Sequence, residues 1–278
     1  MARMDYSVLM SVYHKERPEF LRQAMESIAK QTVPTNDFVL VCDGPLNEQL
    51  DEVIAQMQNV FGQLLHVVRL EKNMGLGNAL NIGIQHCKND LVARMDSDDI
   101  SRPDRCERQL NAFSSIPGLG LLSCSILEFS NDINEVTGKR TVPETNDAIV
   151  AYSRKRNPMN HPAIMFRKTE VEAAGGYSES FHLFEDYYLW VRMLQKGVIA
   201  ANLQESLLYM RTPADMFQRR GGVQYAKDML KFRWWMHKSG WSNWKDFTLS
   251  ALPQAVVCIM PNWLRTKVYL NLNAKKEK

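Results

Sequence analysis

The sequence predicts an α/β fold: a mostly parallel twisted sheet with helices on both faces, followed by a helical C-terminal extension. Over the first hundred residues, short apolar runs alternate with amphipathic helical patterns, which is the rhythm of strand–helix–strand units. One apolar run, residues 91–95, ends abruptly in carboxylates at Asp96, Asp98 and Asp99. Open α/β sheets bind their ligands at the carboxyl ends of strands, so these acids are expected at a ligand site.

The first half of the chain supplies four expected strands and the helices between them. Pro18 stands where the first helix begins, because its fixed φ suits the first helical turn. Glycines at 75 and 77 open a short third helix that runs through Ile84. The strands are expected at residues 7–13, 38–42, 64–70 and 91–95. The apolar faces of the first two helices are Phe20, Leu21, Ala24, Met25 and Ile28, and Leu50, Val53, Ile54 and Met57.

After Asp99 the alternation becomes less regular. Glu185 and Asp186 open a helix whose inward residues include Trp190, and a Gly175-Gly176 break precedes it. The other elements expected here are a helix from Pro103, a strand at 120–129, a turn-rich stretch at 131–138, a helix capped by Thr145, a strand at 163–166, and short strands near Ile199 and at 207–210. From Thr212 onward the pattern is helical.

Composition excludes several classes of protein. The chain has 278 residues, 45% apolar and 23% charged, and its net charge of +3 gives no overall field for nucleic acid. Five scattered cysteines without C-x-x-C spacing indicate core thiols in a reducing compartment. The sequence shows no signal-peptide pattern and no apolar run near the ~20 residues that a membrane span needs. A cytoplasmic protein without a nucleic-acid partner is therefore expected.

The acidic cluster at the end of the fourth strand indicates a divalent cation. Three carboxylates this close repel one another unless a cation compensates them, and Mg²⁺ and Mn²⁺ prefer oxygen ligands. A solvated acidic turn is the simplest alternative. An EF-hand loop would need glycine at its sixth position, where Ser101 stands. A phosphohydrolase with an aspartyl nucleophile also ends a strand in D-x-D, but that class uses its first strand.

Several motifs in order along residues 6–211 resemble those of glycosyltransferase family 2, the inverting nucleotide-sugar transferases of GT-A fold. The match is to bacterial capsule, exopolysaccharide and O-antigen enzymes in particular. The glycine loop after the third strand differs from a dinucleotide fingerprint, because the third glycine is missing. The motifs are Tyr13 after the first strand, Asp43-Gly44, Asn73-x-Gly75 through Asn81-x-Gly83, Asp96-Ser97-Asp98-Asp99, His161-Pro162, and Glu185-Asp186 with Trp190.

The resemblance implies a UDP-linked sugar donor and a divalent metal, Mn²⁺ or Mg²⁺. Asp43 would accept the N3–H of uracil, although an Asp before Gly44 is also an ordinary turn residue. Asp98 would bind the metal that bridges the diphosphate, and Asp96 would face the ribose and the metal. Many relatives carry Arg where this chain has Leu80, so Asn78 or Lys72 is expected to contact phosphate instead. The complete set of donor-binding candidates is Ser11, Val12, Tyr13, Asp43, Asn73, Gly75, Asn78, Asp96 and Ser97.

The resemblance also implies that Asp186 is the catalytic base that deprotonates the acceptor hydroxyl. Acids at a helix N-terminus are favoured by the free N–H groups and the helix dipole, so a purely structural role is the alternative. The same alternative applies to His161 and Trp190, which are as compatible with a protein core as with a ligand pocket. The candidates for contact with the acceptor or the diphosphate are His161, Glu185, Trp190 and Arg211, with Arg219 and Arg220 as further diphosphate candidates.

The resemblance divides the chain into a transferase domain, residues 1–211, and a helical extension, residues 212–278. The domain has a nucleotide-binding half (1–100) and an acceptor-binding half (101–211). The extension is basic and rich in tryptophan, which favours a peripheral position on the anionic inner face of the cytoplasmic membrane, with some tryptophans in the core. The basic and tryptophan residues from the end of the domain onward include Arg211, Arg219, Arg220, Lys227, Lys231, Arg233, Trp234, Trp235, Trp241, Trp244 and Trp263.

The implied activity is inverting transfer of one sugar from a UDP donor to a hydroxyl of a saccharide acceptor. The acceptor is expected on a lipid diphosphate, in the synthesis of a bacterial surface polysaccharide. Two other functions stay open at this point. One is a metal-dependent phosphohydrolase that uses Asp96 and Asp98. The other is a non-catalytic module that binds a nucleotide sugar or a glycan.

Overall fold

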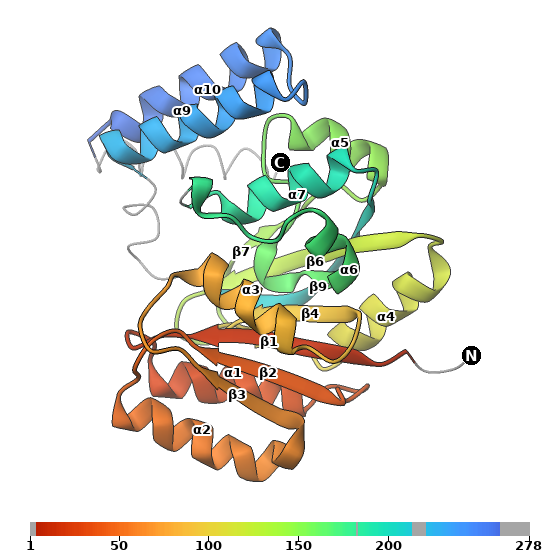
Figure 1. The fold of residues 1–278 in the computed structure, drawn as a ribbon, viewed down its shortest axis with the longest axis vertical. Coiled ribbons are helices and arrows are strands. Elements are labelled where there is room, and N and C mark those ends of the chain that lie inside the picture. The colour runs from red at the N-terminus through yellow and green to blue at the C-terminus, as the bar shows by residue number, and fades with distance from the viewer. Residues whose placement is uncertain (1–3, 182, 213–220, 262–278) are drawn as a thin grey trace.

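The computed structural model describes residues 4–181, 183–212 and 221–261, and its centre is one nine-stranded mixed sheet (Figure 1). The strand order is β3-β2-β1-β4-β8-β6-β9-β5, and β7 pairs with β6 outside this path. The strands are β1 (Tyr6–Val12), β2 (Asp37–Cys42), β3 (Leu65–Arg69), β4 (Leu91–Asp96), β5 (Ile100–Ser101), β6 (Leu119–Phe129), β7 (Val136–Arg140), β8 (Met165–Arg167) and β9 (Ile199–Arg211).

Helices cover both faces of this sheet, which confirms the predicted fold class. In Figure 1, α1 and α2 lie on one side of β1–β3, and α3 lies on the other. The helices are α1 (Pro18–Ala29), α2 (Glu48–Phe61), α3 (Leu76–His86), α4 (Arg105–Ser115), α5 (Asn146–Ser153), α6 (Lys168–Ala173), α7 (Glu185–Gln195), α9 (Val223–Lys238) and α10 (Trp244–Ile259). Short 3₁₀ turns are η1 (Gly62–Leu64), η2 (His161–Ala163) and η3 (Glu179–Phe181).

The first four strands are parallel, as predicted, and their register aligns the polar residues at their ends. Val12 pairs with Cys42, and Ser11 pairs with Asp96, so β1, β2 and β4 end together. All six residues of β2 are buried, as expected for a strand covered on both faces. Gly83 lets α3 approach the sheet closely, because a Cβ there would lie 2.3 Å from Leu9 Cδ1.

The second half of the sheet differs from the sequence prediction in several places. The two short strands expected near Ile199 and at 207–210 are one strand, β9, whose pairing with β6 shifts register near Ser125. Polar residues at these irregularities interrupt the apolar alternation, which hid the continuity. The expected turn-rich stretch contains the start of β7, and α4 begins at Arg105 instead of Pro103. Neither β5 nor α6 was predicted.

Two antiparallel helices, α9 and α10, form a hairpin beyond the sheet. Figure 1 shows the hairpin lying over α7, and Gly222 N donates to Cys258 O where α9 begins and α10 ends. One aromatic and aliphatic cluster joins the hairpin to α7 and the segment before it: Phe181, Phe184, Tyr187, Val191, Met229, Phe232, Met236 and Ala251. Among the described residues, no helix is both long and apolar enough to cross a membrane.

Candidate active site

Asp96 ends β4 in contact with a buried arginine that the sequence reasoning missed. Arg94 is 1% exposed, and both of its Nη atoms donate to the Asp96 carboxylate, with Nη1 3.0 Å from Oδ2. The two side chains can meet because residues i and i+2 of a strand share a face. A charged residue inside an apolar strand was the available signal, since arginine is seldom fully buried without a partner. Arg94 thus fixes the orientation of Asp96.

Asp98 and Asp99 lie where the ionised form of a carboxylate is unfavourable. Burial, followed by the charges of Asp96 and Glu16, raises the pKa of Asp98 to about 7. Burial and Asp98 also raise the pKa of Asp99 well above its ordinary value. Glu16, which the sequence reasoning missed, reaches the turn by accepting a 2.6 Å hydrogen bond from Ser97 Oγ. These carboxylates suit a divalent cation, because its charge would offset their repulsion.

The protein supplies only part of the ligand set that such a cation needs. Within the described ranges, no three His, Cys, Asp or Glu side chains gather into a metal-binding group. Mg²⁺ and Mn²⁺ sites commonly combine one or two carboxylates with substrate phosphates and water. Asp99 Oδ2 is buried without a hydrogen-bond partner, while Oδ1 accepts from Arg211 N at 2.8 Å. The donor set therefore fits a cation shared with a bound diphosphate.

Arg211 hydrogen-bonds to two residues of the acidic turn, Asp98 and Asp99. Its Nε donates to Asp98 O at 3.0 Å, and its guanidinium lies 3.7 Å from the Phe20 ring centroid and 4.5 Å from that of Phe129. The other two nitrogens donate to Ser130 O and Gln23 Oε1. These contacts are structural, so a diphosphate contact by Arg211 stays a prediction. Arg219 and Arg220, the other diphosphate candidates, lie outside the described residues.

Asp43 contacts the glycine loop that follows β3. Asp43 is 4% exposed, and its two oxygens accept from Met74 N at 2.6 Å and Gly75 N at 3.1 Å. Asn73 Nδ2 donates to Asp43 O. Each carboxylate oxygen keeps a second lone pair, which leaves acceptor capacity for a base N–H. Tyr13 follows β1 with 39% of its surface exposed, so its ring is available for stacking.

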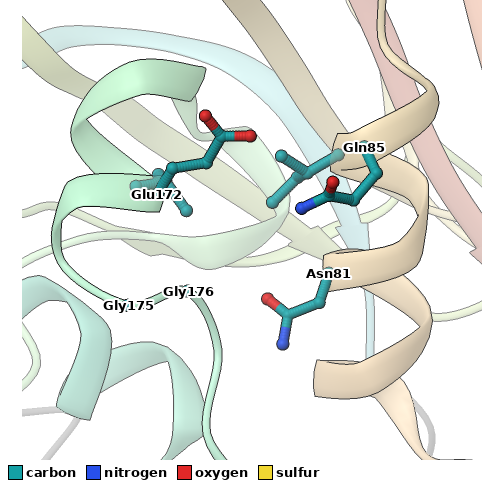
Figure 2. Close-up of a pocket in the computed structure, with 7 residues that line it drawn as sticks. Asn81, Gln85, Glu172, Gly175 and Gly176 are labelled. Carbon is teal, nitrogen blue, oxygen red and sulfur yellow. The ribbon is translucent and has the colours of Figure 1, made fainter.

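The N-terminal turn of α3 joins the two halves of the domain. Asn78 Nδ2 donates to Glu179 Oε1 and to Met74 O, and Asn81 hydrogen-bonds both N and O of Tyr177. The amide of Asn78 is thus engaged within the protein, and its phosphate contact stays a prediction. Beside Asn81 lies a cavity of about 310 Å³ between α3 and α6, shown in Figure 2. None of the predicted site residues lines this cavity.

Asp186, in the first turn of α7, lies in a setting that suits a base. Its Oδ2 accepts from Asn157 Nδ2 at 2.7 Å, and its Oδ1 accepts from Tyr187 N at 2.6 Å. Burial, followed by the charge of Glu185, raises the pKa of Asp186 to about 6. A carboxylate with this pKa is mostly ionised at neutral pH and is more basic than an ordinary aspartate. Asn157 was missed as a site residue, although its stiff, proline-flanked loop was visible in the sequence.

His161, which is half-buried, contacts the buried aromatic rings of Tyr177 and Trp190. His161 Nε2 and Tyr177 Oη are 2.9 Å apart, and the His161 and Trp190 ring centroids are 5.8 Å apart. Burial and the charge of Arg94 lower the pKa of His161 well below its ordinary value, so the ring is neutral. Trp190 is fully buried and belongs to the hydrophobic core against which α7 packs. Acceptor contacts by these two residues stay predictions.

Comparison with known proteins agrees with this geometry. The sequence model described as Glycosyl transferase family 2 matches residues 7–171, more than half of the chain. An Escherichia coli UDP-Gal:alpha-D-GlcNAc-diphosphoundecaprenol beta-1,3-galactosyltransferase is 36% identical over 95% of this chain and 94% of its own. The amylovoran biosynthesis glycosyltransferase AmsE of Erwinia amylovora is 40% identical over 81% of this chain and 83% of its own.

Solved structures show the same fold. A mannosyltransferase from Pyrobaculum calidifontis, in complex with GDP-Man and Mn²⁺, has a TM-score of 0.65 at 17% identity, over 97% of this chain and 81% of its own. Staphylococcus aureus TarS 1–349, in complex with UDP-GlcNAc, has a TM-score of 0.63 at 19% identity, over 82% of this chain and 65% of its own. These findings confirm the resemblance drawn from the ordered motifs. The chain belongs to glycosyltransferase family 2 and is an enzyme that transfers sugar.

Proposed function

We propose that this protein transfers one sugar, with inversion, from a UDP donor to a hydroxyl of a saccharide on a lipid diphosphate. The observation that carries the proposal is the proximity of three groups. Asp43 and the acidic turn follow strands that end together, and Arg94, which binds Asp96, also acts electrostatically on Asp186 at the start of α7. The name of the E. coli relative gives UDP-Gal as donor and a GlcNAc-diphospholipid as acceptor, which supports this substrate class. Such a transfer builds a bacterial surface polysaccharide.

In the proposed mechanism, each half of the domain handles one substrate. Asp43 accepts the base N–H, and Asp96, oriented by Arg94, accepts hydrogen bonds from the ribose. A divalent cation held by Asp98, with Asp96 beside it, would stabilise the negative charge of the leaving diphosphate. Asp186 removes the proton from the acceptor hydroxyl as that oxygen attacks the sugar from the opposite face. One displacement of this kind inverts the configuration at the sugar carbon.

The hairpin is the proposed contact with the cytoplasmic membrane that carries the lipid-linked acceptor. Four exposed apolar residues of α10, from Leu249 to Ile259, follow one another at intervals of three and four positions, which places them on one face. Trp235 packs in the cluster with α7, Trp241 donates to Ser153 Oγ, and Arg233 is buried. These three residues therefore contact the rest of the protein and do not face the lipid. The residues proposed to face the lipid are Trp234, Trp244, Leu249, Leu252, Val256 and Ile259, between 40% and 62% exposed.

A panel of nucleotide sugars tests the donor assignment directly. Purified protein is mixed with each sugar and Mn²⁺, and protection from thermal unfolding is followed by an assay of transfer to a GlcNAc-diphospholipid. A UDP-sugar present at 100 times its Kd should add about 2.7 kcal/mol to the free energy of unfolding. Release of inorganic phosphate from the donor alone would favour a phosphohydrolase. Binding without transfer to any acceptor would favour a binding module.

A further inference from the structure

We propose that Arg233, on α9, positions Asp186 for proton removal, so that the C-terminal hairpin serves the reaction as well as the membrane. This inference rests on the proposed role of Asp186 as the base. Arg233 does not contact Asp186 itself. It acts through two structures that hold the carboxylate: the turn that follows α5, and the first turn of α7.

The first route runs through the turn after α5. Arg233 is 5% exposed; its Nη1 donates to Arg154 O at 3.3 Å, and its Nη2 donates to Lys155 O. This turn leads to Asn157, whose Nδ2 donates to Asp186 Oδ2 at 2.7 Å. A shift of the turn would therefore lengthen or break the Asn157 bond.

The second route runs through Tyr187, the neighbour of Asp186. Arg233 Nη1 lies 3.1 Å from Tyr187 Oη, which in turn donates to Ser153 O at 2.5 Å. The backbone N–H of Tyr187 donates to Asp186 Oδ1 at 2.6 Å. Arg233 thus reaches both oxygens of Asp186, each through one intermediate residue or turn.

Other hairpin contacts support the same two structures. Asp246 of α10 lies 3.3 Å from Lys155 Nζ, and Trp241 Nε1 donates to Ser153 Oγ at 3.0 Å. The rings of Phe232 and Phe184 stack with centroids 5.5 Å apart, directly before α7 begins. In Figure 1 the hairpin lies across α5 and α7 together. The hairpin therefore sets how the turn and the helix sit relative to each other.

An arginine suits this role better than an apolar residue. Burying a guanidinium costs free energy that an apolar side chain of similar volume would avoid. Its planar fork, in return, fixes two carbonyls and one hydroxyl in definite directions. Packing alone would fill the space without orienting the turn. The placement of a base matters strongly, since a misplacement of about 1 Å can cost ~10²-fold in rate.

The test is a double-mutant cycle on the full-length chain, assayed with UDP-Gal and a GlcNAc-diphospholipid. Arg233→Gln is made in the wild-type background and in the Asp186→Asn background. We expect a loss of kcat of about tenfold or more in the first background, with the donor Kd unchanged, and no further loss in the second. Equal losses in both backgrounds, or no loss in either, would overturn the inference.

The pH profile gives a second readout that simple destabilisation would not move. The charged and titratable groups that act on Asp186 are Glu185, Arg94, Tyr177 and Tyr187. The Asn157 hydrogen bond favours the ionised form, so its loss should raise the pKa of Asp186 and move the acid limb of kcat to higher pH. An acid limb that stays in place in Arg233→Gln would contradict the proposal.

Control variants separate positioning from folding. Tyr187→Phe removes one hydroxyl, and it replaces Arg233→Gln in the cycle if the latter does not fold. Arg233→Lys should recover part of the lost turnover, because an ammonium group reaches one of the carbonyls. Met57→Ala, on α2, supplies a variant of reduced stability whose kcat should be unchanged. If Asp186→Asn itself turned over like wild type, the proposed base would fail. An inactive Asp186→Asn variant together with a fully active Arg233→Gln variant would refute the positioning role of Arg233 and leave Asp186 as the proposed base.

Discussion

At the scale of single residues, the carboxylates of the site differ in which groups offset their negative charge. Asp96 has the guanidinium of Arg94, while Asp43 and Asp186 accept hydrogen bonds from backbone and amide N–H groups. Among the described residues, no side chain forms a hydrogen bond or ion pair with the Asp98 carboxylate, and burial together with the charges of Asp96 and Glu16 raises its pKa to about 7. Asp98, the proposed metal ligand, is thus one of the two least compensated carboxylates of the site, together with Asp99. In the proposed mechanism, Asp43, Asp96 and Asp186 contact the substrates.

Asp186→Asn should separate turnover from donor binding. The substitution keeps the shape but removes the basic oxygen, so kcat should fall by roughly 10²–10⁴-fold while the donor Kd barely changes. Glu185→Gln is the matched control and should cost less, since adjacent helical residues do not share a face. Both quantities are measured at one metal concentration. If Asp186→Asn turned over like wild type while Glu185→Gln was inactive, Glu185 and not Asp186 would be the base.

The pH dependence of turnover follows from the raised pKa of Asp186. Only the ionised carboxylate accepts the proton, so kcat should fall as pH drops through the pKa, which is about 6. The experiment is a kcat profile between pH 5 and 8, these limits being about one to two units around that value. Wild-type enzyme should lose its activity on the acid side, and the residual rate of Asp186→Asn should show no such limb. A residual rate with the same limb would assign the titration to another group.

Removal of divalent ions should abolish transfer, and Mn²⁺ or Mg²⁺ should restore it. Asp98→Asn should lose metal-dependent donor binding. The same change should not destabilise the metal-free protein, because it removes a charge that burial, Asp96 and Glu16 disfavour. Calorimetric titration with UDP and Mn²⁺, together with denaturant unfolding, measures both effects. Full activity in excess chelator would refute the metal assignment.

Arg94→Met should weaken both folding and donor binding, because it leaves Asp96 without its partner. Breaking a fully buried pair costs about 3–5 kcal/mol, and the cost here should be lower because the Asp96 side chain is 34% exposed. Arg167→Met is the matched control: its pair with Asp90 is exposed by 33% and 38%, so the change should cost under about 1 kcal/mol. Denaturant unfolding compares the two. Equal costs would mean that Arg94 does not orient Asp96.

At the scale of secondary structure, strand ends and helix starts decide which residues meet. The parallel register of β1, β2 and β4 brings Val12, Cys42 and Asp96 to one edge of the sheet. The N-terminus of α3 then connects this edge to the acceptor half through Asn78 and Asn81. The hairpin, by contrast, packs one face on α7 and leaves an apolar face of α10 exposed. Element packing thus separates the reaction side from the proposed membrane side.

Charges placed on the exposed face of α10 should prevent membrane binding. Leu252→Glu combined with Val256→Glu should reduce sedimentation with vesicles of anionic phospholipid, because both side chains are more than half exposed and would enter the lipid interface. Transfer to a soluble acceptor should be unchanged. Val60→Glu, at an exposed position of α2, is the matched control. Equal sedimentation of all three proteins would rule out this face as the membrane contact.

At the scale of the whole molecule, the hairpin and the acceptor half share one hydrophobic core. A chain ending at Thr212 would expose Phe181, Phe184, Tyr187 and Val191, each worth about 1.5–3 kcal/mol when fully buried. We expect this truncation to lower the stability of α7, detected as faster limited proteolysis there and a lower Tm. An unchanged Tm would mean that the extension is an independent unit. Surface substitutions on α10 therefore test membrane binding better than truncation does.

The sequence by itself determined the fold class, the family and the order of the motifs. Apolar periodicity depends on neighbours a few residues away, so the four parallel strands and the acid-terminated β4 followed from local pattern. The continuity of β9 and the presence of β7 were decided by pairing with β6, which lies far from β9 in the sequence. Pairing energy overrides local propensity at such places, because a strand gains its stability from the neighbour it contacts.

Only the tertiary structure decided how the site residues are supported. Arg94, Glu16, Asn157 and Arg233 lie in four separate parts of the sequence, and each acts through a contact with a carboxylate or a turn brought to it by folding. Arg211, predicted from the sequence as a diphosphate candidate, places its guanidinium between two aromatic rings and donates from Nε to Asp98 O. A motif specifies residue types at short spacing. The free-energy cost of burying a charge depends on the partner that the tertiary structure places beside it.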